Sequence, residues 1–442
     1  MAIIAQNDLF GWEEIDELGD LQRLVLALKS LPDEPLMLAL ERGRGRGRDD
    51  YPIRAVWNSM VAGIVLEHSS IQSLRRELQR NAQLRQVCGF DVTRGEDAVP
   101  PAHAYTRLLK NLFKHAEQID AMFDTLVDEL RDALPQLGQN LAIDSKAIRT
   151  HARRPAQDAR EKHADGRRDT DADTGVKTYK GRREDGTLWE KTRSWFGYKL
   201  HLIVDADYEL PLAYEVTRAS ASDITVAHAM IDDLEESRPE QLETCEHFMG
   251  DKAYDDSKLH VRLWRDSQIK PIIPLRDLWQ DGEKTKLVSG TRNVVHNAQG
   301  DVLCCGPQTG RQRAMAFGGF EKDRNALKYR CPAIYHGVTC EGKQKCPVNN
   351  CVRIKLAEDP RIFGPVARTT YQWPRLYKKR TAVERVNSRL DVSFGFERHF
   401  IRGQAKMRLR CGLALIVMLA MAAGRIKEKR SDLIRSLVST AA

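Results

Sequence analysis

Residues 141–276 alternate between runs of strand length and runs with helical periodicity, and this order restricts the fold more than any other feature. The order is strand, strand, strand, helix, strand, helix, strand, given by LAID, WFGYKLHLIVDAD, LPLAYEVTRAS, DITVAHAMIDDLEES, CEHFMGDKAY, SKLHVRLWRDS and IKPIIPL. Strands and helices in this order pack as a sheet covered by helices. The segment is therefore predicted to be an α/β domain with a mixed sheet.

A chain of 442 residues exceeds what one hydrophobic core organises, so further structural units are expected beside this domain. Residues 18–135 repeat apolar side chains at spacings of three and four and are predicted to be helical. Residues 149–193 hold many charges and few large apolar side chains, which predicts a mobile loop. The longest apolar run, residues 411–424, is too short to span a bilayer comfortably and is predicted to be a buried core helix.

Two acids follow apolar runs of the predicted sheet. Asp144 ends LAID and Asp251 follows HFMG. Carboxylates at the ends of neighbouring strands converge in space, and carboxylate oxygen is the ligand that hard divalent cations prefer. Taken singly, an acid at a strand end is more often a turn former or a helix cap. The two acids in this strand order favour a metal site that a third acid would complete.

A third acid is expected on a helix over residues 376–394. Val383, Val386 and Leu390 form its apolar stripe, whereas Tyr377, Arg380 and Glu384 share another face. The alternative is an ordinary Arg and Glu pair on a solvated face. Basic residues cluster in the same segment and would meet nucleic-acid phosphates; they are Arg375, Lys378, Lys379, Arg380, Arg385 and Arg389. The whole chain carries a net charge of +8, and such a surplus indicates a polyanionic partner where it is clustered.

Six of the nine cysteines lie in residues 277–370, which interrupt the predicted α/β domain. The last four, Cys331, Cys340, Cys346 and Cys351, have spacings of eight, five and four intervening residues, compatible with a small zinc-binding module. They lack the closely spaced pairs of a typical zinc ribbon, so reduced and partly buried thiols are the alternative. The N-terminus lacks a secretory signal pattern, which favours a reducing cytosol over a disulfide framework.

Several of these segments together resemble a known family. LAIDSKAIRTH, WFGYKLHLIVD, MGDKAYDD and YKKRTAVER, in this order, resemble the catalytic core of DDE transposases of bacterial insertion sequences, especially insertion sequence family 4. The region from YPIRAVWNSMVAG to VPPAHAYTRLLKNL resembles the helical N-terminal domain of those enzymes. The likeness covers nearly the whole chain apart from the middle insertion.

The resemblance implies a ribonuclease-H-like mixed sheet flanked by helices, with an all-helical N-terminal domain and a Cys-containing insertion before the last catalytic helix. Asp144, Asp251 and Glu384 would be the catalytic residues and the ligands of two Mg²⁺ ions, for which Mn²⁺ can substitute. Two such metals support in-line phosphoryl transfer. Water would nick the transposon end, and the freed 3′-hydroxyl would join that end to target DNA.

The family signature around the glutamate is tyrosine, arginine, glutamate and lysine at set spacings. Tyr377, Arg380 and Glu384 match, but Asp391 stands in the lysine position. An acid therefore stands where a cation would meet phosphate, and Arg385 or Arg389 would then substitute for it. The DNA-binding residues expected from the signature and the basic cluster are Tyr377, Lys378, Lys379, Arg380, Arg385 and Arg389.

The expected domains are a helical DNA-binding unit over residues 1–136, a catalytic core over 137–276 and 371–428, and an insertion over 277–370. The expected partners are double-stranded DNA, as transposon ends and target, and a second copy of the chain on DNA. The expected location is the cytoplasm, with the bacterial nucleoid. Three alternatives stay open: a catalytically inactive transposase derivative, a protein that only binds DNA, and a metal-dependent nuclease that stops after hydrolysis.

Overall fold

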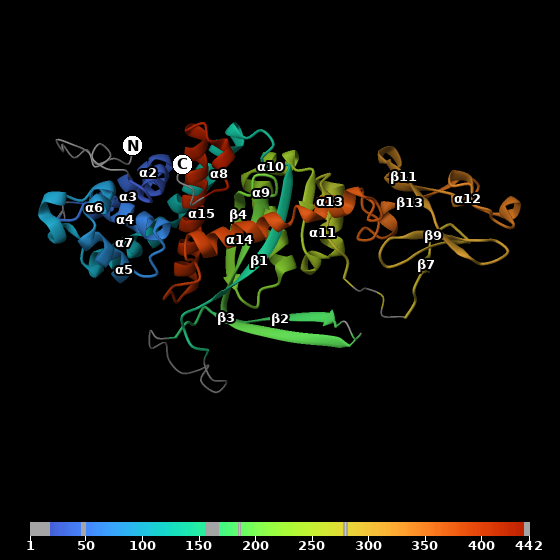
Figure 1. The fold of residues 1–442 in the computed structure, drawn as a ribbon, viewed down its shortest axis with the longest axis horizontal. Coiled ribbons are helices and arrows are strands. Elements are labelled where there is room, and N and C mark those ends of the chain that lie inside the picture. The colour runs from blue at the N-terminus through green and yellow to red at the C-terminus, as the bar shows by residue number, and fades with distance from the viewer. Residues whose placement is uncertain are drawn as a thin grey trace.

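The computed structural model describes residues 18–45, 50–154, 168–183, 185, 187–276, 279 and 282–436. A helical block lies at one end, an α/β body in the middle, and a small β-rich block at the other end (Figure 1). The hydrophobic core is continuous from the helical block into the α/β body, whereas the β-rich block has a second core of its own.

The helical block confirms the helical periodicity of residues 18–135. Its α-helices are α2 (Leu21–Ser30), α3 (Glu34–Arg44), α4 (Ile53–Val65), α5 (Ile71–Arg80), α6 (Ala82–Cys88), α7 (Ala102–Leu112) and α8 (Ala116–Ala133). Ser70 and Asn81 cap α5 and α6 by accepting hydrogen bonds from Ser73 N (3.2 Å) and Leu84 N (2.9 Å). Buried Asp33, directly before α3, links this helix to α4, because it accepts hydrogen bonds from Trp57 Nε1 and Arg54 Nη1, both at 2.6 Å.

The central sheet is mixed, as the strand order predicted. Its strands are β1 (Asn140–Arg149), β2 (Asp173–Arg182), β3 (Leu188–Asp205), β4 (Pro211–Arg218), β5 (His247–Met249) and β6 (Lys270–Ile272). The order is β2-β3-β1-β5-β6, with β4 also paired to β3. β1 runs antiparallel to β3 and parallel to β5. The carboxyl ends of β1 and β5 therefore lie at the same edge of the sheet.

The prediction of a mobile loop over residues 149–193 is wrong for residues 173–182 and 188–193, which form strands. β2 pairs with the first half of β3 and forms a two-stranded ribbon that projects from the sheet (Figure 1). Two tryptophans cover glycines across this ribbon: Trp195 lies over Gly175, and Trp189 lies over Gly181. Cross-strand packing of this kind stabilises charged strands that a search for alternating apolar residues does not detect. Residues 155–167 of the predicted loop lie outside the described residues.

Helices cover the sheet: α9 (Asp223–Ser237), α10 (Pro239–Thr244), α11 (Ser257–Val261), α13 (Gln372–Lys378), α14 (Thr381–Ser393) and α15 (Gln404–Lys427). The predicted helix over 376–394 is two helices, because hydrogen bonding tightens to an i to i+3 pattern between Leu376 and Val383. This turn changes the direction in which the two halves present their side chains.

Helix α15 is the core helix expected from residues 411–424. It packs against α2, α4 and α8 of the helical block and against β4 of the sheet (Figure 1). Among the described residues it alone is long and apolar enough to cross a membrane, yet 83% of its most apolar window is buried inside the protein. Burial on all sides explains its composition without a bilayer.

The β-rich block consists of two small antiparallel sheets. One contains β7 (Lys286–Leu287), β8 (Val294–His296), β9 (Val302–Cys305) and β10 (Gln312–Ala314). The other contains β11 (Ala316–Glu321), β12 (Ala326–Arg330) and β13 (Cys351–Lys355), with the short helix α12 (Pro332–Tyr335) after β12. Val294, Val302, Leu327, Tyr329 and Ile354 contribute to the shared core of the two sheets.

The close approach of α15 to α2 can be tested at Gly424. A methyl group there would lie 2.6 Å from Leu26 Cδ1 and 2.8 Å from Ser30 Oγ. Gly424→Ala is therefore expected to lower the free energy of unfolding by about 1–3 kcal/mol in denaturant titrations. The matched control is Gly63→Ala in α4, where the nearest atom, Leu74 Cδ2, lies at 3.4 Å. A Gly424→Ala protein as stable as the Gly63→Ala protein would contradict this packing.

Candidate active site

The register of β1 and β5 places Asp144 beside Asp251. Asn140 pairs with His247, an offset of 247 − 140 = 107 residues, and the two acids have the same separation, 251 − 144 = 107. Asp251 follows β5 and caps the next turn by accepting a hydrogen bond from Ala253 N at 2.7 Å. Asp144 therefore lies in the middle of β1 and not at a strand end as predicted, and the register places Asp251, two residues beyond β5, beside it.

Helix α14 brings Glu384 to the same edge. Its apolar stripe, Val383, Val386 and Leu390, is fully buried, and the helix packs on β1 and β3. Glu384 lies on a different face, with its side chain 53% exposed. The Arg380 guanidinium links β1 to α14. Its Nη1 lies 3.3 Å from Asp144 Oδ2, and its Nη2 lies 2.6 Å from Glu384 Oε1. The three acids predicted from the sequence therefore gather around one site.

The electrostatics of this site show crowded negative charge. Burial and the neighbouring Asp251 raise the pKa of Asp144 from its ordinary value of 3.8 to about 6, although Arg380 and Lys177 partly offset them. Burial alone would lower the pKa of Arg380, but its hydrogen bond to Glu384 and the charge of Asp144 raise it. The carboxylates of Asp144 and Glu384 thus stabilise a positive charge between them, and the Arg380 guanidinium carries that charge.

Carboxylate oxygens of this kind suit Mg²⁺ or Mn²⁺, so the residues present fit the implied metals. In the part of the chain that the structure describes, no three or more His, Cys, Asp or Glu side chains already stand as a complete set of metal ligands. Arg380 bridges Asp144 and Glu384 in the arrangement seen. A divalent cation would have to replace this guanidinium between the two acids.

Three of the predicted DNA-binding residues instead anchor α14 to the sheet. Arg385 Nε lies 2.7 Å from Glu209 Oε1, and Arg389 Nη2 lies 3.1 Å from Glu209 Oε2. Lys379 Nζ lies 2.6 Å from Asp207 Oδ1 in the same β3–β4 turn. Burial lowers the pKa of Arg389 to about 10. These contacts give all three side chains an architectural role, and their contact with DNA stays a prediction.

The acid in the position of the family lysine has a basic partner from another element. Lys146 Nζ lies 2.5 Å from Asp391 Oδ2 and 3.6 Å from Glu397 Oε1. Lys146 and Asp144 are two residues apart on β1, so they face the same side, toward α14. Lys146 thus supplies an amine beside the site, in addition to Arg385 and Arg389, that can take the place of the family lysine.

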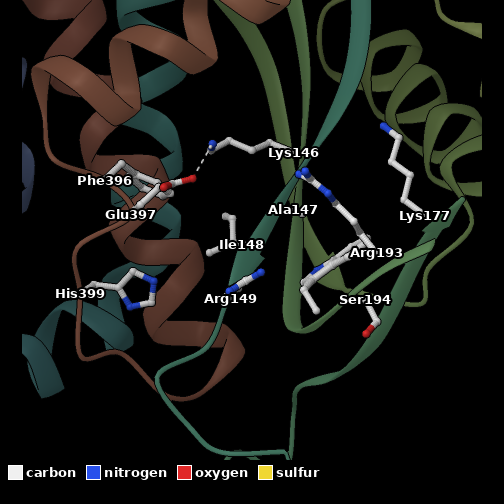
Figure 2. Close-up of a pocket in the computed structure, with 11 residues that line it drawn as sticks. Lys146, Ala147, Ile148, Arg149, Lys177, Arg193, Ser194, Phe396, Glu397 and His399 are labelled. Carbon is white, nitrogen blue, oxygen red and sulfur yellow. Dashed lines mark ion pairs between the residues drawn. The ribbon is translucent and has the colours of Figure 1, made fainter. Parts of the chain in front are cut away.

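A cavity of about 420 Å³ lies next to this amine (Figure 2). Its lining contains the basic side chains Lys146, Arg149, Lys177 and Arg193, together with Glu397. In Figure 2, Lys177 and Arg193 of the ribbon face Glu397 across the cavity. Lys177 and Arg193 pair directly across the strands. Like charges opposite each other destabilise a ribbon, so the cavity is suited to an anion.

Tyr377 and Lys378 lie on α13. The Tyr377 ring stacks on Trp373, with centroids 5.3 Å apart, and the Arg380 guanidinium lies 5.8 Å from the centre of the Tyr377 ring. Lys378 is exposed. Both side chains therefore remain beside the site, where they can meet a substrate.

The cysteines do not gather as predicted. Cys331, Cys340 and Cys346 line one small cavity, but its other thiols are Cys304 and Cys305. Cys351 lies apart, where its Sγ accepts a hydrogen bond from Arg353 Nη1 at 3.5 Å. Cys351, which pairs with Arg330 across β12 and β13, is not among the residues that line this cavity.

Sequence reasoning missed Lys146, Lys177 and Arg193. Lys146 had a detectable signal, since alternation along LAIDSK places it on the face of Asp144. No sequence signal pointed to Lys177 and Arg193, because their position depends on the pairing of β2 with β3.

Comparison with known proteins supports the same assignment for the core. Residues 135–420 match the family described as "Transposase DDE domain". Searches of curated proteins and of solved structures each give no significant match. The matched region spans β1, β5, α14 and most of α15, so it contains all three acids. The chain therefore belongs to the transposase DDE domain family.

Proposed function

We propose that this protein is a DNA transposase, similar to those of insertion sequence family 4, that binds the ends of its element, cleaves DNA strands and joins the ends to target DNA. The catalytic residues are Asp144, Asp251 and Glu384. The observation that carries the proposal is the double contact of Arg380 with Asp144 and Glu384, because it brings acids from β1 and α14 together beside Asp251. Family membership supports the transposase class.

Asp144, Asp251 and Glu384 would hold two Mg²⁺ ions. When bound, such ions activate an attacking oxygen and stabilise the leaving oxygen of an in-line phosphoryl transfer. The protein's own contribution is positional. β1 and β5 fix two carboxylates in register, and α14 brings the third. Arg380, released from the acids, is placed to donate hydrogen bonds to the phosphate.

DNA would approach along the face that carries Tyr377, Lys378, Lys146 and the cationic cavity. Phosphate contacts by Lys and Arg position a duplex without reading its sequence. The ribbon adds Lys177 and Arg193 to this path, and a two-stranded ribbon is narrow enough to enter a major groove. Lys146 would take the place of the family lysine at the DNA end.

The proposed organisation keeps the helical unit over residues 1–136 as a DNA-binding domain, the catalytic core over 137–276 and 371–428, and the insertion over 277–370. Two copies would act on paired ends of the element. The separate core of the β-rich block supports the insertion as a unit, whereas the helical unit and the catalytic core share one continuous core.

If the three acids are catalytic, their substitution should abolish DNA cleavage without weakening DNA binding. Asp144→Asn, Asp251→Asn and Glu384→Gln should each reduce Mg²⁺-dependent cleavage of a labelled transposon end at least about 1000-fold, because a metal contact supplies several kcal/mol to the transition state. Binding of the same DNA should change less than about twofold. Exposed Glu236, remote from the site on α9, gives the control Glu236→Gln with wild-type cleavage.

A pre-cut end with target DNA distinguishes the alternatives. Joined product supports a transposase, whereas hydrolysis without joining indicates a nuclease. Binding without cleavage in Mg²⁺ or Mn²⁺ would contradict the proposal and favour an inactive derivative.

The raised pKa of Asp144 predicts a pH-dependent stability. The folded protein holds this proton up to a pH of about 6, whereas the unfolded chain releases it near 3.8. In EDTA, this residue's contribution to stability should therefore fall as pH rises from about 4 to above 6, by about 1–3 kcal/mol.

The same reasoning predicts how a charge deletion and Mg²⁺ act on stability. At pH 8 in EDTA, Asp251→Asn should melt at a higher temperature than wild type, because it removes one of two facing charges. Mg²⁺ should raise the melting temperature of wild type more than that of Asp251→Asn. Glu236→Gln should follow wild type in both conditions. Equal melting of wild type and Asp251→Asn in EDTA would contradict the crowding of these acids.

The cationic cavity predicts a salt-dependent share of DNA binding. Removing two phosphate contacts in Lys177→Ala/Arg193→Ala should reduce the slope of log affinity against log salt by about 2. Lys258→Ala/Lys322→Ala, at exposed sites on other elements, serves as the charge-matched control with a smaller change. Equal slopes for the two double variants, measured by fluorescence anisotropy, would exclude the cavity from the DNA path.

A further inference from the structure

The β-rich block contains a cavity of about 10 Å³ surrounded by thiols, with no link to the catalytic acids. Its lining includes Cys304 of β9, Cys331 directly after β12, and Cys340 and Cys346 in the segment between β12 and β13. All four are free thiols. Two segments of chain, β9 and the connection from β12 to β13, therefore bring thiols to a space of the size of a single ion.

Strand alternation distinguishes Cys304 from its neighbour Cys305. Cys304 pairs with Val294, which is fully buried, so its side chain faces the core between the two sheets. Cys305 pairs with exposed Gln312 on the opposite face of β9. Burial raises the pKa of Cys304 to about 11, and the charges of Cys331, Cys340 and Cys346 add to this effect. Cys304 is thus the thiol that shares its surroundings with the other three.

The segment that carries Cys340 and Cys346 is held by its backbone. Lys343 N donates to Cys340 O at 3.2 Å, and Cys346 N donates to Lys343 O at 3.1 Å. The Lys343 amine also donates to the carbonyl oxygen of Val348 at 3.0 Å. The two thiols are therefore presented to the cavity from a closed turn.

Hydrogen-bond donors and basic side chains lie beside the thiols. Asn293 Nδ2 donates a hydrogen bond to Cys346 Sγ at 3.4 Å, and the same group reaches Cys305 O at 3.1 Å. Arg311, Arg313 and Lys343 also line the cavity. Hydrogen bonds and positive charges around sulfur lower the cost of deprotonation that metal binding requires. The block itself is small, with two short-stranded sheets, and small units gain most from a metal cross-link.

We propose that Cys304, Cys331, Cys340 and Cys346 form a four-thiolate site for a structural zinc ion that links the two sheets of the β-rich block. Four thiolates in tetrahedral geometry are a ligand set that zinc prefers. As they stand among the described residues, no three of these thiols are placed to hold an ion. Binding would therefore bring the four thiols closer together around the ion. This role is architectural and independent of the metals proposed for Asp144, Asp251 and Glu384.

The test uses the full chain purified without chelators, with zinc content measured by mass spectrometry. Wild type should contain about one zinc per chain, and Cys304→Ser should contain close to none, because a fourth ligand is lost from a closed site. Cys351→Ser and Cys305→Ser are the matched controls and should keep the zinc. Asp144→Asn/Asp251→Asn should also keep it, which separates this site from the catalytic one.

Cobalt substitution keeps the test valid if a variant fails to fold. Wild type reconstituted with Co²⁺ should show the intense thiolate-to-metal absorption of a tetrahedral sulfur site, and Zn²⁺ should displace it. Wild type without zinc and without this absorption would overturn the proposal. Zinc lost in Cys351→Ser and kept in Cys304→Ser would overturn the ligand set.

Discussion

The site depends first on the docking of α14 against the sheet. Glu384 lies 384 − 144 = 240 residues after Asp144, so only this packing brings the two together. Val383 and Leu390 supply the apolar contact. Glu209 supplies the polar one: its side chain is 8% exposed, it sits at φ 58° in the β3–β4 turn, and it pairs with Arg389. Breaking a buried pair of this kind costs about 3–5 kcal/mol, so the strained turn is retained for the contacts it makes.

The charges on the two sides of α14 have different consequences. On one side, Arg385 and Arg389 share the single carboxylate of Glu209, and these contacts hold the helix in place. On the other, Arg380 contacts two acids whose negative charge exceeds its own. The remaining negative charge can attract a metal cation. Because α14 is already fixed on the sheet, the helix need not move when that cation binds.

The sequence predicted those parts of the structure that local pattern determines. The mixed sheet, the position of Asp251 after β5 and the buried stripe of α14 follow from periodicity and turn chemistry, whereas Asp144 lies in the middle of β1 and not at the predicted strand end. The β2–β3 ribbon was not predicted. Its stability comes from the packing of Trp195 over Gly175 and of Trp189 over Gly181, and only the pairing of the two strands creates these contacts. The partners of Lys146, Glu209 and Cys304 are equally distant along the chain. Spacing cannot reveal contacts of this kind, such as those of Arg385 and Arg389 with Glu209.

The most direct test of the account is anomalous diffraction from crystals of the full chain soaked in Mn²⁺. The account predicts Mn²⁺ bound by Asp144, Asp251 and Glu384, with the Arg380 guanidinium moved away from the two acids it contacts. Mn²⁺ bound only elsewhere, with Arg380 still bridging Asp144 and Glu384, would contradict the assignment of these acids as a metal-binding active site.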